Sequence, residues 1–175
     1  MRVLVTAATK YGATAEIAQA IADALGDRGL EPAVLPPEQV EGTDGYDAVV
    51  LGSAVYAGHW LKPARELVQR SAGTLAGRPV WLFSSGPVGE PPKPEEDPVD
   101  VAELMEATGA REHRVFAGKI VRKQLSFPER AIVSALRVPE GDFRDWAEIT
   151  RWAAEIADAL REGPAAGGGG DDRQG

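Results

Sequence analysis

The chain has 175 residues, no cysteine and a formal net charge of −8 at pH 7. A chain without cysteine holds no disulfide, no thiolate nucleophile and no Cys-ligated zinc or iron–sulfur cluster. Its two histidines, His59 and His113, are far apart in the sequence, which argues against a histidine metal site or a catalytic triad. The acidic balance argues against nucleic acid as a partner. We therefore expect no metal and no nucleic acid.

The length fits one domain that buries a core on both faces of a sheet, and we assign it to residues 1–162. Residues 163–175 include four consecutive glycines and too few apolar side chains to offset the entropy cost of ordering, so we predict a disordered tail. No secretory signal precedes the first strand, and no apolar run approaches the ~20 residues that span a bilayer. We expect a cytoplasmic protein.

Apolar runs alternate with helical patterns along the chain. The predicted strands cover residues 2–6, 31–35, 48–53, 79–84 and 112–121, and the predicted helices cover residues 15–28, 61–71, 99–108 and 143–161. This alternation predicts a three-layer α/β sandwich with a five-stranded parallel sheet of order 2-1-3-4-5. Ligands of such sheets bind beyond the carboxyl ends of the strands, where the order reverses. The loops after Thr6, Ser53 and Ser84 should therefore converge.

The first loop, Thr9-Lys10-Tyr11-Gly12-Ala13-Thr14, joins a buried strand to a helix N-terminus. Amide groups that open a helix have no acceptor inside it, and with the helix dipole they attract an anion. The threonine hydroxyls add donors, and Gly12 lets a ligand approach closely. Neither the triphosphate-loop motif nor the dinucleotide motif occurs, which suits one phosphate monoester, as in a mononucleotide. The alternative is an ordinary turn with Thr14 as the N-cap.

The second and third loops carry residues suited to a planar ligand. The second, Gly52 to Trp60, combines small residues with the aromatic rings of Tyr56, His59 and Trp60. Tyr56 could stack on a planar ring, and the alternative is that it packs on the next helix, which is the role we expect for Trp60. The third, Ser84-Ser85-Gly86-Pro87-Val88-Gly89, offers hydroxyl and amide donors, although loops of this composition are common.

Together these three loops resemble the flavodoxin family, and within it the flavodoxin-domain branch similar to menaquinone-dependent protoporphyrinogen oxidase. The resemblance covers roughly residues 1–161 and includes Val115-Phe116-Ala117-Gly118-Lys119. It implies a flavodoxin-like fold that binds FMN. The residues implied to hold the phosphate are Thr6, Thr9, Lys10, Tyr11, Gly12, Ala13 and Thr14. Those implied to flank the isoalloxazine ring are Ser53, Ala54, Val55, Tyr56, Ala57 and Gly58 with Ser84, Ser85, Gly86, Pro87 and Val88.

The chain departs from this branch at two places. Ala8 stands where a serine is common before the first threonine. Tyr56 and Ala57 precede the Gly58-His59 pair where the oxidase tends to carry a basic and then an aromatic residue.

The segment from Lys119 to Val138 is basic in an otherwise acidic chain, with five Lys and Arg against Glu129 alone, interleaved with apolar residues. Such a segment could contact an anionic partner, a carboxylated substrate or a membrane surface that holds a quinone. The alternative is an insert in the fifth strand whose apolar side covers the sheet.

Three functions remain open at this point. The first is an FMN-dependent oxidoreductase that exchanges electrons with a quinone or similar small redox partner. The others are a one-electron carrier for protein partners and a flavin-less binding module. A phosphate-accepting receiver domain is excluded, because Thr6-Ala7 and Gly52-Ser53 stand where it needs carboxylates. No residue is singled out as catalytic, since flavin chemistry needs no general acid or base here.

Overall fold

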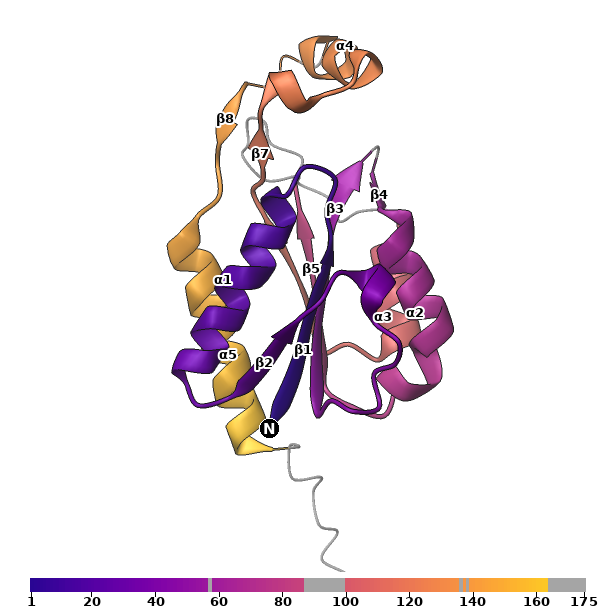
Figure 1. Cartoon of the computed structure of the whole chain (residues 1–175), viewed down its shortest axis with the longest axis vertical. Coiled ribbons are helices and arrows are strands. Elements are labelled where there is room, and N and C mark those ends of the chain that lie inside the picture. The colour runs from indigo at the N-terminus through magenta and orange to yellow at the C-terminus, as the bar shows by residue number, and fades with distance from the viewer. Residues whose placement is uncertain (57, 87–99, 136, 138, 164–175) are drawn as a thin grey trace, which may run out of the picture.

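The computed structural model describes residues 1–56, 58–86, 100–135, 137 and 139–163. Its centre is a parallel sheet in which the strands follow the order β2-β1-β3-β5-β6 (Figure 1). These strands are β1 (Arg2–Ala8), β2 (Glu31–Val34), β3 (Ala48–Tyr56), β5 (Val80–Ser85) and β6 (Glu112–Phe116). The predicted order 2-1-3-4-5 is confirmed. The three central strands, β1, β3 and β5, are mainly apolar and buried because helices cover both faces of the sheet.

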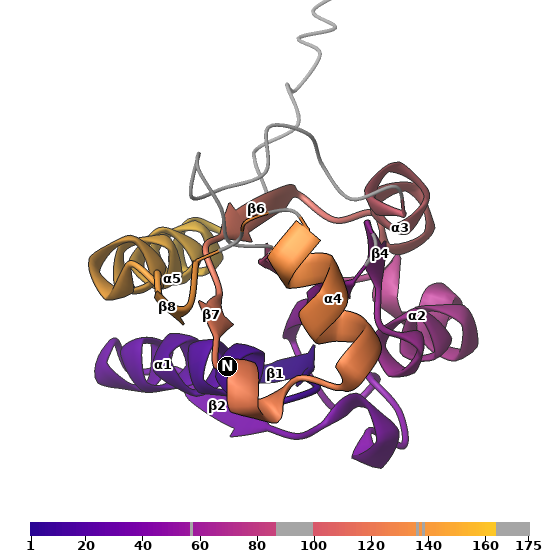
Figure 2. The same cartoon turned by 90° about the horizontal axis from the view of Figure 1, so that it is seen from above.

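Two helices cover each face, which makes the three layers visible from above in Figure 2. Helices α1 (Ala13–Asp27) and α5 (Trp146–Glu162) lie on one face, and α2 (Lys62–Leu75) and α3 (Val101–Thr108) lie on the other. A short 3-10 turn, η1 (Pro37–Gln39), follows β2. The α5 N-cap is Asp145, whose carboxylate accepts a hydrogen bond of 3.1 Å from the Glu148 amide.

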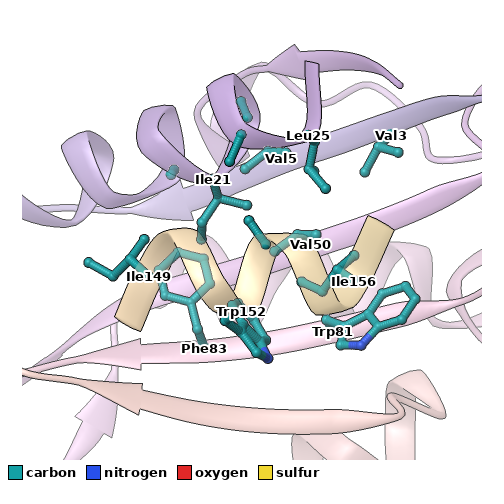
Figure 3. Packing of buried hydrophobic residues seen from close by; sticks show 14 of the residues in the cluster. Val3, Val5, Ile21, Leu25, Val50, Trp81, Phe83, Ile149, Trp152 and Ile156 are labelled. Carbon is teal, nitrogen blue, oxygen red and sulfur yellow. The ribbon is translucent and has the colours of Figure 1, made fainter. Parts of the chain in front are cut away.

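An aromatic cluster fills the layer between the sheet and α5 (Figure 3). The ring centroids of Phe83, Phe116 and Trp152 lie 5.5 to 6.1 Å apart, with tilted and edge-to-face geometries. Trp152 also donates a hydrogen bond of 3.1 Å from its indole nitrogen to the Glu112 carboxylate. This cluster fixes α5 against β5 and β6, the strands on the side of the sheet away from β2.

The predicted fifth strand, residues 112–121, is wrong in its second half. Strand β6 ends at Phe116 because its neighbour β5 ends at Ser85, and the carbonyl of Phe116 accepts a hydrogen bond of 3.0 Å from the Gly86 amide. The chain then leaves the sheet. Its continuation β7 (Lys119–Ile120) pairs antiparallel with β8 (Gly141–Asp142), and between them lie the 3-10 turn η2 (Arg122–Gln124) and helix α4 (Phe127–Ala135).

The second loop is more ordered than the sequence suggested. Strand β3 runs three residues past its predicted end, to Tyr56, and pairs antiparallel with the two-residue strand β4 (His59–Trp60). The predicted tail lies outside the described residues except for Gly163, so its disorder and the domain boundary stay predictions. Within the described part of the chain, no helix is long and apolar enough to cross a membrane.

Gly52 allows the aromatic cluster to form, and this generates a stability prediction. A Cβ at Gly52 would lie 2.2 Å from Cζ of Phe83, its neighbour on β5. Gly52→Ala should therefore displace a buried ring and lower the free energy of unfolding by about 1–3 kcal/mol. Urea unfolding followed by circular dichroism measures this.

The matched control is Gly73→Ala in α2, where a Cβ meets nothing within 4 Å. That change should raise stability by roughly 0.5–1 kcal/mol, because alanine loses less backbone entropy in a helix. Equal stability of Gly52→Ala and wild type would contradict the packing described above.

Candidate functional site

The first loop leads into the N-terminus of α1, where three backbone amides have no acceptor within the helix. Gly12 adopts a left-handed conformation (φ +92°), and its amide donates a hydrogen bond of 2.9 Å to Oγ1 of Thr9. The first helical hydrogen bond runs from the Glu16 amide to the Gly12 carbonyl, at 3.1 Å. The amides of Ala13, Thr14 and Ala15 therefore have no acceptor within the helix. These donors, with the positive end of the helix dipole, can hold an anion.

The second loop contributes one aromatic ring, that of Tyr56, to the lining of the site. Tyr56 ends β3, and Gly58 turns the hairpin with φ +79°. Trp60 is buried instead, and its indole nitrogen donates a hydrogen bond of 2.7 Å to Oγ of Ser84, so its predicted packing role is confirmed. The Ser84 hydroxyl also lies 2.7 Å from Nε2 of His113, within the core.

Hydrogen bonds to Ser53 and Asp100 hold β4 in place. Oγ of Ser53 accepts a hydrogen bond of 2.9 Å from the Leu61 amide and donates one of 2.8 Å to the Ala54 carbonyl. The Asp100 carboxylate lies 3.1 Å from Nδ1 of His59 and accepts a hydrogen bond from the backbone amide that follows His59. These contacts fix the hairpin whose tip carries Tyr56 and Gly58.

The third loop and the end of β6 approach each other closely. A Cβ at Gly118 would lie 3.2 Å from Cα of Gly86, so a larger residue at 118 would force the two segments apart. The Gly118 carbonyl accepts a hydrogen bond of 3.0 Å from the Phe143 amide. After this close contact the chain leaves the sheet and continues into β7.

Helix α4 lies beyond the carboxyl ends of the strands and across the top of the sheet, as Figures 1 and 2 together show. We call the segment from η2 through α4 the lid. Between the lid and the three loops is a cavity of about 380 Å³. Pockets that bind small molecules span roughly 300–1,000 Å³, so the size suits one cofactor.

The cavity brings together eleven of the predicted site residues: Thr9, Lys10, Tyr11, Ala13, Thr14, Ala54, Val55, Tyr56, Gly58, Ser85 and Gly86. Four others lie beside it without lining it, namely Thr6, Gly12, Ser53 and Ser84. Ala57, Pro87 and Val88 lie outside the described residues. Sequence reasoning did not assign a cofactor role to the residues that close the cavity from above: Gly118, Lys119, Ile120, Val121, Gln124, Leu125, Glu129, Ile132 and Val133.

Glu129 latches the lid to the first loop. Its carboxylate forms an ion pair with Lys10 and accepts hydrogen bonds of 2.9 and 2.8 Å from the Tyr11 hydroxyl. Ser126, within the lid, donates a further hydrogen bond of 2.8 Å. The Lys10 ammonium also lies 5.2 Å from the centroid of the Tyr56 ring. The only acidic residue of the basic segment is thus turned toward the cavity and neutralised there.

We call the contacts of Glu129 with Lys10 and Tyr11 the latch, and they determine the protonation state of the Glu129 carboxylate. Partial burial works to raise the pKa of Glu129, but hydrogen bonds from Lys10, Ser126 and Tyr11 outweigh it and hold that pKa below its ordinary value of 4.5. The hydrogen bond with Glu129 raises the pKa of Lys10. Burial, together with the Glu129 charge, raises the pKa of Tyr56 to about 12, so its ring stays neutral. Near neutral pH the latch is fully charged.

Arg144, which follows β8, binds the first turn of α1 and so holds the two-stranded ribbon β7–β8 against that helix. Its guanidinium bonds the Ala13 carbonyl at 3.2 Å, pairs with Glu16 and binds Asp142 at 2.7 Å. The hydrogen bond from Arg144, against some opposing burial, lowers the pKa of Asp142 to about 2. Nothing in the sequence pattern marked Arg144 for this role. The lid is therefore tied through Glu129 to the loop before α1, and the ribbon that carries the lid is tied through Arg144 to the first turn of α1.

The chemistry of this donor set fits FMN. Backbone amides and hydroxyls at the start of α1 suit a phosphate, and Glu129, the one carboxylate among the described residues that line the cavity, is paired with Lys10. The rest of the lining is mainly apolar, which suits a planar flavin ring. Within the described residues, no group of His, Asp and Glu side chains is arranged to hold a metal ion.

A family model described as "Flavodoxin domain" matches residues 4–146. The chain is 24% identical over 172 residues to the protoporphyrinogen IX dehydrogenase [quinone] of Escherichia coli K12, covering 90% of this chain and 95% of that protein.

Solved structures share the fold. A flavodoxin from the domain Archaea superposes with a TM-score of 0.63 at 19% identity, covering 92% of this chain and 99% of the other. Flavodoxin 1 from Bacillus cereus gives 0.60 at 15% identity, covering 91% and 99%. The rubredoxin oxygen:oxidoreductase of Desulfovibrio gigas gives 0.63 at 16% identity, covering 94% of this chain but 37% of that one.

The latch generates a prediction about local opening. Glu129→Gln removes the carboxylate charge, so α4 amides should exchange with deuterium roughly fivefold faster at pH 7, for a loss of about 1 kcal/mol. Hydrogen–deuterium exchange with peptide resolution measures this. Glu66→Gln, which breaks the exposed Lys62–Glu66 pair in α2, is the charge-matched control and should leave α4 unchanged.

The same latch should depend on pH. Because folding lowers the pKa of Glu129, the charged form contributes stability above pH 4.5, and this contribution is lost as the pH falls through the lowered value. The difference between wild type and Glu129→Gln should therefore vanish in acid. A difference that stays constant from pH 7 to well below pH 4.5 would contradict the latch.

Proposed function

The chain belongs to the flavodoxin domain family, and we propose that it binds FMN and transfers electrons to or from a quinone or a similar small redox partner. The observation that supports this most is the convergence of open helix amides and an aromatic wall on one cavity at the point where the strand order reverses. FMN supplies the redox chemistry when it is bound. The chain itself supplies position, exclusion of water and the local electric field.

We assign the phosphate to the amides of Ala13, Thr14 and Ala15, with the hydroxyls of Thr9 and Thr14 beside them. One helix N-terminus serves one phosphate group. FAD carries a pyrophosphate, and the sequence holds no Gly-x-Gly-x-x-Gly motif after a strand to bind it. FMN is therefore the preferred flavin.

We assign the ring to the space bounded by Tyr56, Gly58, Ser85 and Gly86, beneath the lid. The roles of Ala57, Pro87 and Val88 beside it stay predictions. The lid carries apolar side chains over this space, so it would shield a reduced flavin from water.

The partner is proposed from two observations. The similar E. coli protein carries quinone in its name and is covered almost end to end. The lid side of the cavity is lined by Leu125, Ile132 and Val133, which suit an apolar acceptor better than a charged one. The flavodoxins of similar fold favour the second candidate, a one-electron carrier for protein partners. The cytoplasmic location stays a prediction.

Gly12→Val tests the phosphate assignment. At φ +92° a β-branched residue is strained, so the loop should change shape and FMN affinity should fall tenfold or more. Gly29→Val is the matched control, since Gly29 has φ +85° at the other end of α1 and equally open surroundings. It should cost stability but leave FMN affinity unchanged. Equal FMN affinity in the two variants would rule out this cradle.

Tyr56→Ala tests the ring assignment. Loss of a stacking face should weaken FMN binding by about 1 kcal/mol, roughly fivefold, in oxidised and fully reduced protein alike. Tyr56→Phe keeps the face and should bind as wild type does. Fluorescence quenching measures the affinity of each variant for oxidised FMN, and the reduction potentials of bound and free FMN then give the affinity for the reduced form. An unchanged affinity of Tyr56→Ala would remove Tyr56 from the ring site.

A reductive titration with FMN bound separates the two candidate functions. The oxidoreductase predicts uptake of two electrons together and turnover with a soluble quinone. A carrier predicts reduction in two separated one-electron steps and no quinone turnover. Protein that binds no flavin, even after incubation with FMN, would contradict both and indicate a binding module.

A further inference from the structure

We propose that the outer face of the lid docks on a membrane surface that carries anionic lipid headgroups. This face consists of Arg122, Lys123, Phe127 and Arg130 together with Arg137, which follows α4. It is distinct from the inner face, which lines the cavity. The spacing along α4 separates the two, because Glu129, Ile132 and Val133 line the cavity whereas Phe127 and Arg130 do not.

The first observation is an exposed aromatic ring. Phe127 is 85% exposed, and the next most exposed large apolar side chain among the described residues, Ile132 at 58%, belongs to the same helix. A large apolar side chain left in water on a folded domain usually marks a contact surface. Figure 1 shows α4 at the far end of the molecule, beyond the sheet and its covering helices. The exposed ring of Phe127 thus belongs to the helix that a surface approaching from that end would meet first.

The second observation is charge of the opposite sign to the rest of the chain. Arg122, Lys123, Arg130 and Arg137 are exposed, and none of the ion pairs found in the described part of the chain involves them. The Arg130 guanidinium instead bonds the Arg122 carbonyl at 3.0 Å, which holds its charge beside Lys123. The protein as a whole carries −8.

The nearby carboxylates do not cancel this charge. Glu129 faces inward and is neutralised by Lys10. Glu140 accepts a hydrogen bond of 3.1 Å from the Arg122 amide, and it is one carboxylate beside four cations. An anionic membrane would attract the lid and repel the acidic remainder, so it would orient the protein with the lid toward the lipid.

A membrane fits this face better than a protein does. Stable protein interfaces bury about 800 Å² on each partner, whereas α4 has 9 residues, projects from the body and presents one large ring. A ring surrounded by cations is the arrangement with which peripheral proteins enter the interfacial region of a bilayer. Docking would bring the apolar inner side of the lid close to the lipid, where a lipid-soluble quinone resides. Delivery of quinone from the lipid rests on the proposed function, whereas docking on the membrane does not.

Vesicle flotation of the full chain tests the proposal, with phosphatidylcholine vesicles and with phosphatidylcholine–phosphatidylglycerol vesicles. Wild type should bind only the anionic vesicles, less as salt rises. Arg122→Gln with Lys123→Gln should lower the partition coefficient about tenfold or more, and Phe127→Ser should lower it severalfold. Lys62→Gln with Arg151→Gln removes the same charge from α2 and α5, and Val34→Ser removes an exposed apolar side chain from β2. Both controls should bind as wild type does.

Each other outcome overturns the proposal. Wild type that ignores anionic vesicles, or lid variants that stay folded by circular dichroism and bind undiminished, would show that the lid does not dock on lipid. Slower reduction of an acidic redox protein by the Arg122 and Lys123 variant, without vesicle binding, would make the lid a protein-docking surface. Because flotation needs no flavin, flavin-free protein that floats upholds the docking while the proposed function fails. Protein that reduces soluble quinone but does not float leaves only the docking wrong.

Discussion

The parallel pairing of β1, β3 and β5 is the constraint on which the rest of the structure depends. In this register the last residue of β1, Ala8, lies beside Ser53, and the last residue of β5, Ser85, lies beside Ala54, so both strands end at the same edge of the sheet while β3 runs on to Tyr56. Each loop that leaves this edge starts at a fixed place, and α1 begins with its amides directed at the same space. Gly52 contributes to this arrangement, because only a residue without a side chain leaves room for the Phe83 ring across the β3–β5 pair. The site is thus a consequence of sheet geometry before any ligand is considered.

The lid covers the cavity on the side that the sheet and its loops leave open. The chain leaves the sheet where Gly118 meets Gly86. Glu129 ties the lid to the first loop, and Arg144, which follows β8, ties the ribbon that carries the lid to the first turn of α1. Glu129 binds Lys10 and Tyr11 of the same loop that forms the proposed phosphate site, so we expect lid opening to change that site as well. The lid is mainly apolar on its inner face, and it carries Arg122, Lys123 and Arg130 outside the cavity lining.

Most of the sheet could be predicted from the sequence because its strands are continuous apolar runs between helical patterns, as the strand at 48–53 illustrates. The loops could be predicted because their chemistry is local. The path after Phe116 could not, since residues 112–121 read as one strand and only the end of the neighbouring β5 stops the pairing. The inward turn of Glu129 depends on Lys10, which is 119 residues away along the chain, and no local pattern records such a contact. Ser84 was a reasonable ligand donor by position, but Trp60 and His113 engage its hydroxyl.

The central claim is that the loops after β1, β3 and β5 and the lid form one FMN site. A crystal structure of the protein grown with excess FMN tests it most directly. The account predicts the phosphate within hydrogen-bond distance of the Ala13, Thr14 and Ala15 amides, with the ring against Tyr56 and beneath α4. Crystals without bound FMN, or with FMN held anywhere else on the molecule, would contradict it.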